Sequence, residues 1–121
     1  MNRTILVVDD NELNARLFSD LLQAQGYETL HAANGAEGLA LARSRRPDLI
    51  IMDLELPVMC GREAAGRAKQ DSDLRSIPII AVSAFPTKQG QRLAQGNGCD
   101  AYLEKPIRPE PFLATVRHFL G

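Results

Sequence analysis

The run of four apolar residues from Leu49 to Met52 limits the possible folds more than any other stretch of the sequence. It lies between Pro47-Asp48 and an exit that ends at Pro57. A short, unbroken apolar run with such borders is typical of a strand buried on both faces, as in a parallel sheet. Asp53 follows the run directly, and open α/β sheets bind their ligands at the carboxyl ends of the strands. We therefore expect Asp53 to be the chemical centre of the protein.

The rest of the chain alternates between short apolar runs and segments in which apolar residues recur at helical spacing. Strands are predicted at Thr4–Val8, Glu28–Ala32, Leu49–Met52, Ile77–Ser83 and Asp100–Glu104. A helix is predicted after each strand, at about 11–25, 36–46, 62–70, 86–95 and 109–120. The alternation predicts an α/β fold, a (βα)5 doubly wound, five-stranded parallel sheet with helices on both faces.

Local features refine this prediction at three places. Asn11 is suited to cap the first helix, and Leu13, Leu17 and Leu21 recur at helical spacing within it. The second strand is less apolar than the others, which favours a place at the sheet edge. The fourth helix is expected to be weak because Gly90 lies inside it, and segments of low local stability are the ones that move.

Composition and charge limit the classes of function. At 121 residues the chain is long enough for one domain, and we expect a single domain over residues 1–121 without an output domain. A net charge of −1 argues against nucleic acid or an anionic membrane as a partner. The first apolar run is too short for a signal peptide, and no run approaches the roughly 18 residues of a membrane span. We therefore expect a cytoplasmic protein.

The cysteines and histidines do not indicate a metal centre of their own. Cys60 and Cys99 form no CxxC motif, which predicts two free thiols, with Cys99 in a small buried site and Cys60 in a loop. His31 and His118 are far apart in the sequence and have no partners at ligand spacing. Both histidines are therefore expected at the surface.

Polar residues follow four of the predicted strands: Asp9 and Asp10, then Asp53, then Ser83, then Lys105. Because the carboxyl ends of parallel strands meet at one edge, these side chains are expected around one shallow cleft. Three carboxylates so close together repel one another, and a hard cation such as Mg²⁺ relieves that repulsion. A metal, a lysine and a hydroxyl together suit a phosphoryl group, with Asp53 as the nucleophile that forms an aspartyl phosphate.

Each of these residues also has a structural explanation. Asp9 and Asp10 could cap the next helix, and Lys105 by itself could be a solvated lysine. Asp53 at the end of a buried strand is more informative, whereas Ser83 alone says little. Their occurrence on successive strand ends favours the functional interpretation.

Four segments of the sequence resemble the CheY-like receiver domain of two-component response regulators, and the resemblance covers essentially the whole chain. The segments are Val7–Asn11, Asp53–Gly61, Val82–Ala84 and Gly98–Pro106. Further details at Asn11–Asn14, Gln25–Thr29 and Ser83–Phe85 are similar to single-domain members of the family. The resemblance implies the flavodoxin-like receiver fold.

The resemblance also implies what Asp53 does. The residue would accept a phosphoryl group from a phosphohistidine on a histidine kinase or a histidine phosphotransfer protein. Mg²⁺, or Mn²⁺ in its place, would be bound by Asp9, Asp10, Asp53 and the backbone carbonyl of Glu55. The implied ligands of the phosphoryl oxygens are Lys105 and the backbone N–H groups of Leu54, Glu55 and Ala84.

Ser83 and Tyr102 are the implied switch residues: Ser83 would swing toward the phosphoryl group and Tyr102 would turn inward with it. The Lys105–Pro106 peptide bond would be cis. The phosphodonor would dock on the first helix and the loop after Lys105, with Asn14, Leu17, Phe18, Pro106 and Ile107 as candidates. A downstream target protein would bind the face made by the fourth helix, the fifth strand and the last helix.

Three classes of function follow. The first is a phosphorylation-controlled signalling switch of a phosphorelay, which is no enzyme beyond its own phosphotransfer and dephosphorylation. The second is an Mg²⁺-dependent aspartyl-phosphate phosphohydrolase, for which Glu55 has the spacing of the acid/base but the chain is short and lacks a cap. The third is a receiver-like scaffold that binds partners without phosphorylation, and the complete set of polar residues argues against it.

Overall fold

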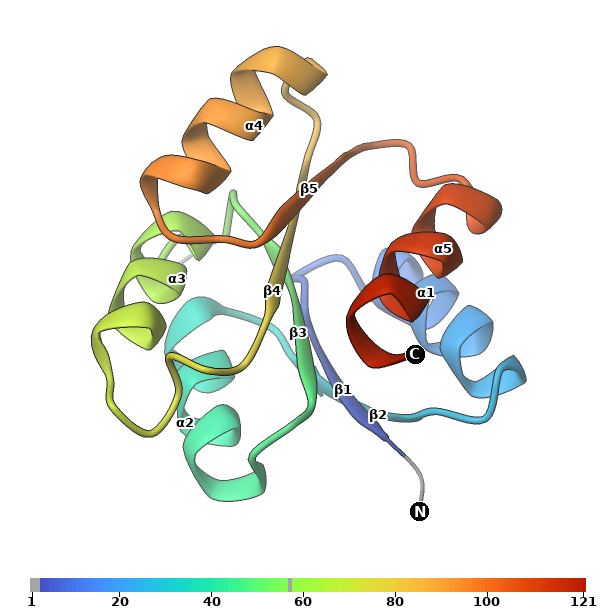
Figure 1. The fold of residues 1–121 in the computed structure, drawn as a ribbon, viewed down its shortest axis with the longest axis horizontal. Coiled ribbons are helices and arrows are strands. Elements are labelled where there is room, and N and C mark those ends of the chain that lie inside the picture. Colours follow the sequence, from blue (N-terminus) through green and yellow to red (C-terminus); the bar gives the residue numbers. More distant parts are fainter. Residues whose placement is uncertain (1–2, 57) are drawn as a thin grey trace.

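The computed structural model describes residues 3–56 and 58–121 (Figure 1). Pro57, the expected exit from the central strand, lies outside the described residues. Five strands form one sheet in the order β2-β1-β3-β4-β5, and every neighbouring pair is parallel. The strands are β1 (Thr4–Val8), β2 (Glu28–Ala32), β3 (Leu49–Asp53), β4 (Ile79–Ser83) and β5 (Ala101–Glu104). The predicted (βα)5 parallel fold is confirmed, as is the edge position of β2.

A helix follows each strand and the helices cover both faces of the sheet (Figure 1). One face carries α1 and α5, and the other carries α2, α3 and α4. The helices are α1 (Glu12–Ala24), α2 (Gly35–Arg45), α3 (Gly61–Gln70), α4 (Thr87–Gly96) and α5 (Pro109–Leu120).

Each face of the sheet builds its own hydrophobic core. Ile5 and Val7 of β1 pack toward α1 and α5, where the rings of Phe18 and Phe112 lie 5.1 Å apart. Leu6, between them in the sequence, packs on the opposite side with α2 and α3. All five residues of β3 are buried, so the apolar run of the central strand is covered on both faces as predicted.

Helix caps explain several boundaries. The Asn11 side chain accepts a hydrogen bond from the Asn14 N–H at 3.0 Å, which confirms the predicted cap of α1. Asn34 caps α2 in the same way by accepting from the Glu37 N–H at 2.9 Å, so that this helix begins at Gly35. The helix therefore begins one residue before the predicted start at 36.

β4 and β5 both begin later than predicted. Ile77, the predicted start of β4, donates its N–H to the Leu74 carbonyl and so belongs to the preceding turn. Pro78 has no N–H to donate to the sheet, and β4 begins at Ile79. Asp100 stays outside β5 while its carboxylate accepts from the Ile79 N–H and from Lys69, each at 2.9 Å or less.

The apolar residues of α1 divide between a buried face and an exposed one. Ala15, Phe18 and Leu22 are buried against the sheet. Leu13 is 78% exposed and Leu17 is 46% exposed, so these two leucines do not belong to the core. The helical spacing of the leucines predicts the helix but not its buried face, and the outward position of Leu17 is compatible with its place among the docking candidates.

The remaining expectations concern single residues. Both cysteines are free thiols, with Cys99 buried and Cys60 partly exposed at the start of α3. Burial raises the pKa of Cys99 to about 11. His31 and His118 are exposed, as expected. In the part of the chain that the structure describes, no helix has the length and apolar character needed to cross a membrane.

Candidate functional site

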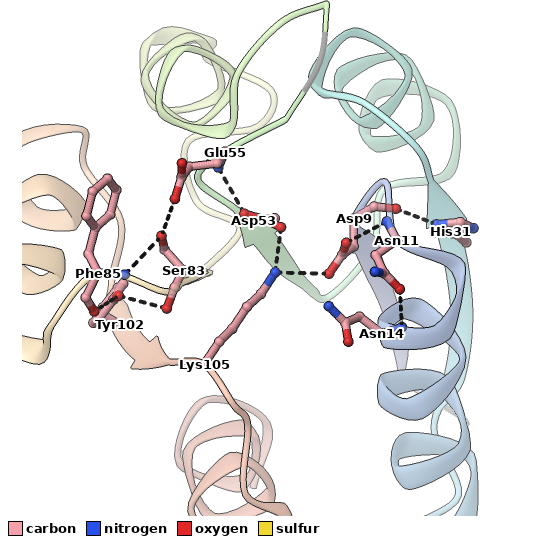
Figure 2. Close-up of polar contacts among 10 residues, drawn as sticks. All are labelled: Asp9, Asn11, Asn14, His31, Asp53, Glu55, Ser83, Phe85, Tyr102 and Lys105. Atoms are coloured by element: carbon pink, nitrogen blue, oxygen red, sulfur yellow. Dashed lines mark hydrogen bonds and ion pairs between the residues drawn. The ribbon is translucent and has the colours of Figure 1, made fainter.

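Polar side chains meet where β1, β3, β4 and β5 end (Figure 2). The register places Met52 beside Val8, and therefore brings Asp53 next to Asp9 at the end of the central strands. Asp9, Asp53 and Ser83 are buried, with 1%, 4% and 1% of their surface exposed. Buried polar side chains without a structural necessity indicate a functional site.

Lys105 links the acidic residues. Its Nζ donates a hydrogen bond to Asp53 Oδ2 at 2.7 Å and lies 3.6 Å from Asp9 Oδ2 (Figure 2). Burial lowers the pKa of Lys105, but the hydrogen bond and the charges of the two aspartates outweigh it and raise the pKa overall. The lysine is therefore a cation at neutral pH.

Each carboxylate oxygen of Asp53 accepts one hydrogen bond. Oδ1 accepts a hydrogen bond from the Glu55 N–H at 2.9 Å, while Oδ2 accepts from Lys105. Burial raises the pKa of Asp53, and this effect is larger than the opposite effects of Lys105 and the Glu55 N–H. The charged form of Asp53 is thus costly in the folded protein. A bound cation would lower this cost.

Asp9 and its neighbours complete an acidic cluster. Carboxylate oxygens of Asp9, Asp10 and Asp53 all lie within 4.8 Å of one another. Asp9 Oδ1 accepts from the Asn11 N–H at 2.9 Å, whereas the buried Oδ2 has no hydrogen-bond partner among the described residues. A buried carboxylate oxygen without a hydrogen bond is costly even with the Lys105 ammonium 3.6 Å away, and a divalent cation would supply a direct ligand for it. The oxygen-only donor set fits Mg²⁺.

The backbone around the site differs in one respect from what the family resemblance implies. The Leu54 N–H donates to the Val82 carbonyl at 3.0 Å and is thus part of the hydrogen bonding between β3 and β4. The Glu55 N–H is directed to Asp53, and Ala84 follows Ser83 directly. Glu55 and Ala84 are therefore better placed than Leu54 to supply N–H groups to a ligand on Asp53.

The N-terminus of α3 approaches Asp53 closely at Gly61. A Cβ atom at this position would collide with the Asp53 carbonyl oxygen. Glycine is therefore required for the helix to start directly behind the central carboxylate.

Ser83 and Tyr102 form a chain of contacts that leads away from Asp53. The Ser83 hydroxyl donates to Glu55 Oε1 at 3.1 Å. The Tyr102 hydroxyl donates to the Phe85 carbonyl at 2.6 Å and lies 3.0 Å from the Ser83 carbonyl (Figure 2). Tyr102 is 9% exposed, so its ring lies inward. Burial raises the pKa of this hydroxyl, which therefore stays a donor at neutral pH.

Gly90 makes room for that ring. A Cβ atom at position 90 would collide with three carbons of the Tyr102 ring. The glycine inside α4, which the sequence indicates only as a weak point of the helix, has a packing function. Sequence reasoning missed it because no local signal links position 90 to position 102.

A groove of about 400 Å³ opens beside Lys105 between α1 and the loop that follows β5. Its lining residues are Asn14, Leu17, Phe18, Ala84, Lys105, Pro106 and Ile107, which include all the candidates for phosphodonor docking. Phe18 is only 1% exposed because its ring belongs to the core. Of the two candidates Leu17 and Phe18, Leu17 is therefore the one that is accessible to a partner. The Lys105–Pro106 peptide bond is cis, as the resemblance implies.

A second groove lies on the other side of α1. It has a volume of about 520 Å³ and is lined by polar residues that include Glu12, Arg16 and His31. None of the side chains around Asp53 lines it. His31 reaches the site only indirectly, through its Nε2, which lies 2.8 Å from the Asp9 carbonyl oxygen.

Comparison with known proteins agrees with this geometry. Residues 5–117 match the family described as the response regulator receiver domain. The chain is 47% identical over 121 residues to the polar-differentiation response regulator DivK of Brucella anthropi, and the match covers 100% of this chain and 98% of that protein.

Two solved structures bear on the chemistry of the site. The receiver domain of a sensor histidine kinase from Pseudomonas aeruginosa, solved with a magnesium ion coordinated in its active-site cleft, superposes with a TM-score of 0.91. It is 28% identical and the match covers 100% of this chain and 99% of that one. A receiver domain from Saccharomyces cerevisiae, solved with the histidine phosphotransfer protein upstream of it, gives a TM-score of 0.90 at 26% identity, over 98% of this chain and 88% of that one.

Replacing Gly90 tests the contact with Tyr102. We expect Gly90→Ala to lower the free energy of unfolding by roughly 1–3 kcal/mol, because the added methyl group overpacks against the ring. Gly66 is the matched control, since a Cβ atom there meets nothing within 4 Å. Gly66→Ala should raise stability by roughly 0.5–1 kcal/mol through the lower backbone entropy of alanine. Urea unfolding measures both, and equal stabilisation by the two variants would contradict the assignment.

The raised pKa of Asp53 predicts a pH dependence of stability. The folded protein binds this proton more tightly than the unfolded chain, whose ordinary pKa is 3.8, so ionisation of Asp53 removes stability as the pH rises above that value. Asp53→Asn lacks this loss. In a buffer without divalent cations, the free energy of unfolding of the variant relative to wild type should increase between about pH 4 and about pH 7.

The matched control for this pH series is Asp20→Asn, since Asp20 is exposed on α1. The difference between Asp20→Asn and wild type should change little over the same range. A difference between Asp53→Asn and wild type that stays flat, or that falls with rising pH, would show that burial does not dominate at Asp53.

Proposed function

The chain belongs to the response regulator receiver domain family of two-component signalling, and we propose that it accepts a phosphoryl group on Asp53 and thereby changes its affinity for partner proteins. The observation that carries this proposal is the position of the buried Asp53 carboxylate, 2.7 Å from Lys105 Nζ and within 4.8 Å of two further carboxylates. A nucleophile, a fixed cation and a set of metal-binding oxygens thus lie at one point of the sheet edge.

The chemistry of transfer follows from these contacts. A carboxylate oxygen of Asp53 attacks the phosphorus of a phosphohistidine, the new P–O bond forms, and the P–N bond to the imidazole breaks. Lys105 and the N–H groups of Glu55 and Ala84 stabilise the charge on the phosphoryl oxygens. Asp9, Asp10, Asp53 and the Glu55 carbonyl would hold Mg²⁺, or Mn²⁺ in its place, which neutralises carboxylate and phosphoryl charge when bound.

The contacts of Glu55 favour a switch over a phosphohydrolase. A phosphohydrolase of the type considered from the sequence would need the Glu55 carboxyl group as its acid/base beside Asp53. The Glu55 carboxylate instead accepts the Ser83 hydroxyl at 3.1 Å. The protein is therefore no enzyme beyond its own phosphotransfer and dephosphorylation.

The groove beside Lys105 is the docking site for the phosphodonor, which is a histidine kinase or a histidine phosphotransfer protein in the cytoplasm. Its outward side chains Leu17, Pro106 and Ile107 are apolar, and its inner wall contains Lys105. A donor helix that covers the groove would bring its phosphohistidine next to the lysine. The yeast receiver solved with its phosphotransfer protein supports a partner of this class.

The output is a change on the face made by α4, β5 and α5. Ser83 ends β4 and is linked to Tyr102 of β5 through the carbonyls of Ser83 and Phe85. A movement of Ser83 toward a phosphoryl group therefore acts on the segment that precedes α4. The downstream partner is a protein, with no part for nucleic acid or a membrane.

Intact mass tests the acceptor. After incubation with Mg²⁺ and acetyl phosphate, wild type should gain the mass of one phosphoryl group, and the gain should be lost in base. Asp53→Asn should gain none, since its amide is not a nucleophile. If wild type gains no phosphoryl group from acetyl phosphate or from a phosphorylated histidine phosphotransfer protein, the proposal fails and a scaffold without phosphorylation is favoured.

Amide-shift mapping separates the docking face from the output face. Addition of an unphosphorylated histidine phosphotransfer domain should shift amides around Leu17 and Ile107. Loading with beryllofluoride and Mg²⁺ should instead shift amides from Ala84 to Gly98, beyond those directly around Asp53. Shifts confined to the residues around Asp53 in the second titration would contradict the proposed output face.

A further inference from the structure

The Glu55 side chain has a contact that the proposed phosphotransfer does not use. Glu55 Oε1 accepts the hydrogen bond of the Ser83 hydroxyl at 3.1 Å (Figure 2). Ser83 is 1% exposed, whereas Glu55 is an exposed residue of the loop after β3. The buried hydroxyl at the end of the neighbouring strand thus donates its one proton to an exposed carboxylate.

A serine hydroxyl has one proton and can donate one full hydrogen bond at a time. While Ser83 donates to Glu55, it cannot donate to an acceptor on Asp53. Both acceptors are anions, so the two hydrogen bonds are of the same charge-assisted kind and compete directly.

We propose that Glu55 is a positioning residue that holds the Ser83 hydroxyl away from Asp53, so that phosphorylation must displace Ser83 from Glu55 before the switch can operate. This inference rests on the proposed phosphorylation of Asp53. It assigns a role to the Glu55 side chain that is separate from the metal-binding role of its backbone carbonyl.

The contacts of Ser83 explain why its displacement would reach α4. The Phe85 N–H points at Ser83 Oγ, at the long distance of 3.4 Å, and the Phe85 carbonyl accepts from the Tyr102 hydroxyl at 2.6 Å. The ring of Tyr102 in turn lies against Gly90 of α4. Rotation of Ser83 therefore changes a series of direct contacts that begins at Glu55 and ends inside the helix.

The proposal is tested by measuring the affinity for beryllofluoride in the presence of Mg²⁺ by calorimetry. Glu55→Ala and Glu55→Gln should bind this phosphoryl analogue about three- to tenfold more tightly than wild type, because the neutral variants compete less for the Ser83 proton. Ser83→Ala should bind it more weakly. In the Ser83→Ala background, Glu55→Ala should produce a gain at least about threefold smaller than in wild type.

The double-mutant cycle separates positioning from simple repulsion. If Glu55 acts only through its charge, Glu55→Ala improves binding equally with and without the Ser83 hydroxyl, and the proposal is overturned. Glu28→Gln is the matched control, since the exposed Glu28 carboxylate accepts the Thr4 hydroxyl at 3.4 Å at the opposite end of the strands from Asp53. This variant should change the affinity for beryllofluoride by less than about twofold.

The same samples distinguish failure of the inference from failure of the proposed function. If wild type binds no beryllofluoride with Mg²⁺ and takes no phosphoryl group, the function of Asp53 is wrong. If wild type binds it and the Glu55 variants bind equally well, only the role of Glu55 is wrong. Beryllofluoride binding is compared at Mg²⁺ concentrations that saturate each variant, so that a change in Mg²⁺ affinity does not enter the comparison.

Discussion

The contact between Lys105 and the two buried aspartates is the interaction on which the other features of the site depend. Asp53 is almost completely buried, and its charged form is tolerated because Lys105 and the Glu55 N–H each donate to one of its oxygens. Asp9 adds a second buried carboxylate with an oxygen that lacks a partner among the described residues. The edge of the sheet therefore has more negative than positive charge, which favours the binding of a cation there.

The fold makes this arrangement possible because it delivers residues that are far apart in the sequence to one edge. Parallel strands all end on the same side, so Asp9, Asp53, Ser83 and Lys105 meet although more than 90 positions separate the first from the last. The apolar strands behind them are covered by helices on both faces, which provides a rigid support. Gly61 allows α3 to begin directly behind Asp53.

A series of direct contacts connects the site with the proposed output face. Glu55 accepts from Ser83, the Phe85 carbonyl accepts from the Tyr102 hydroxyl, which also lies 3.0 Å from the Ser83 carbonyl, and the Tyr102 ring lies against Gly90. Each link has a small number of alternative arrangements, since a hydroxyl donates once and a buried ring has little free space. Under the proposed function, a phosphoryl group on Asp53 would act on α4 through these contacts.

The sequence by itself determined the strand and helix order, the family and the identity of the polar residues, because strand ends and apolar runs are local features of the chain. It also named residues that line one groove beside Lys105, although it did not separate the outward Leu17 from the buried Phe18. Only the tertiary structure decided which face of α1 is buried, that Glu55 holds Ser83, and that Gly90 accommodates Tyr102. These features are contacts between segments distant in the sequence, and local spacing carries no information about which side chains packing will bring together.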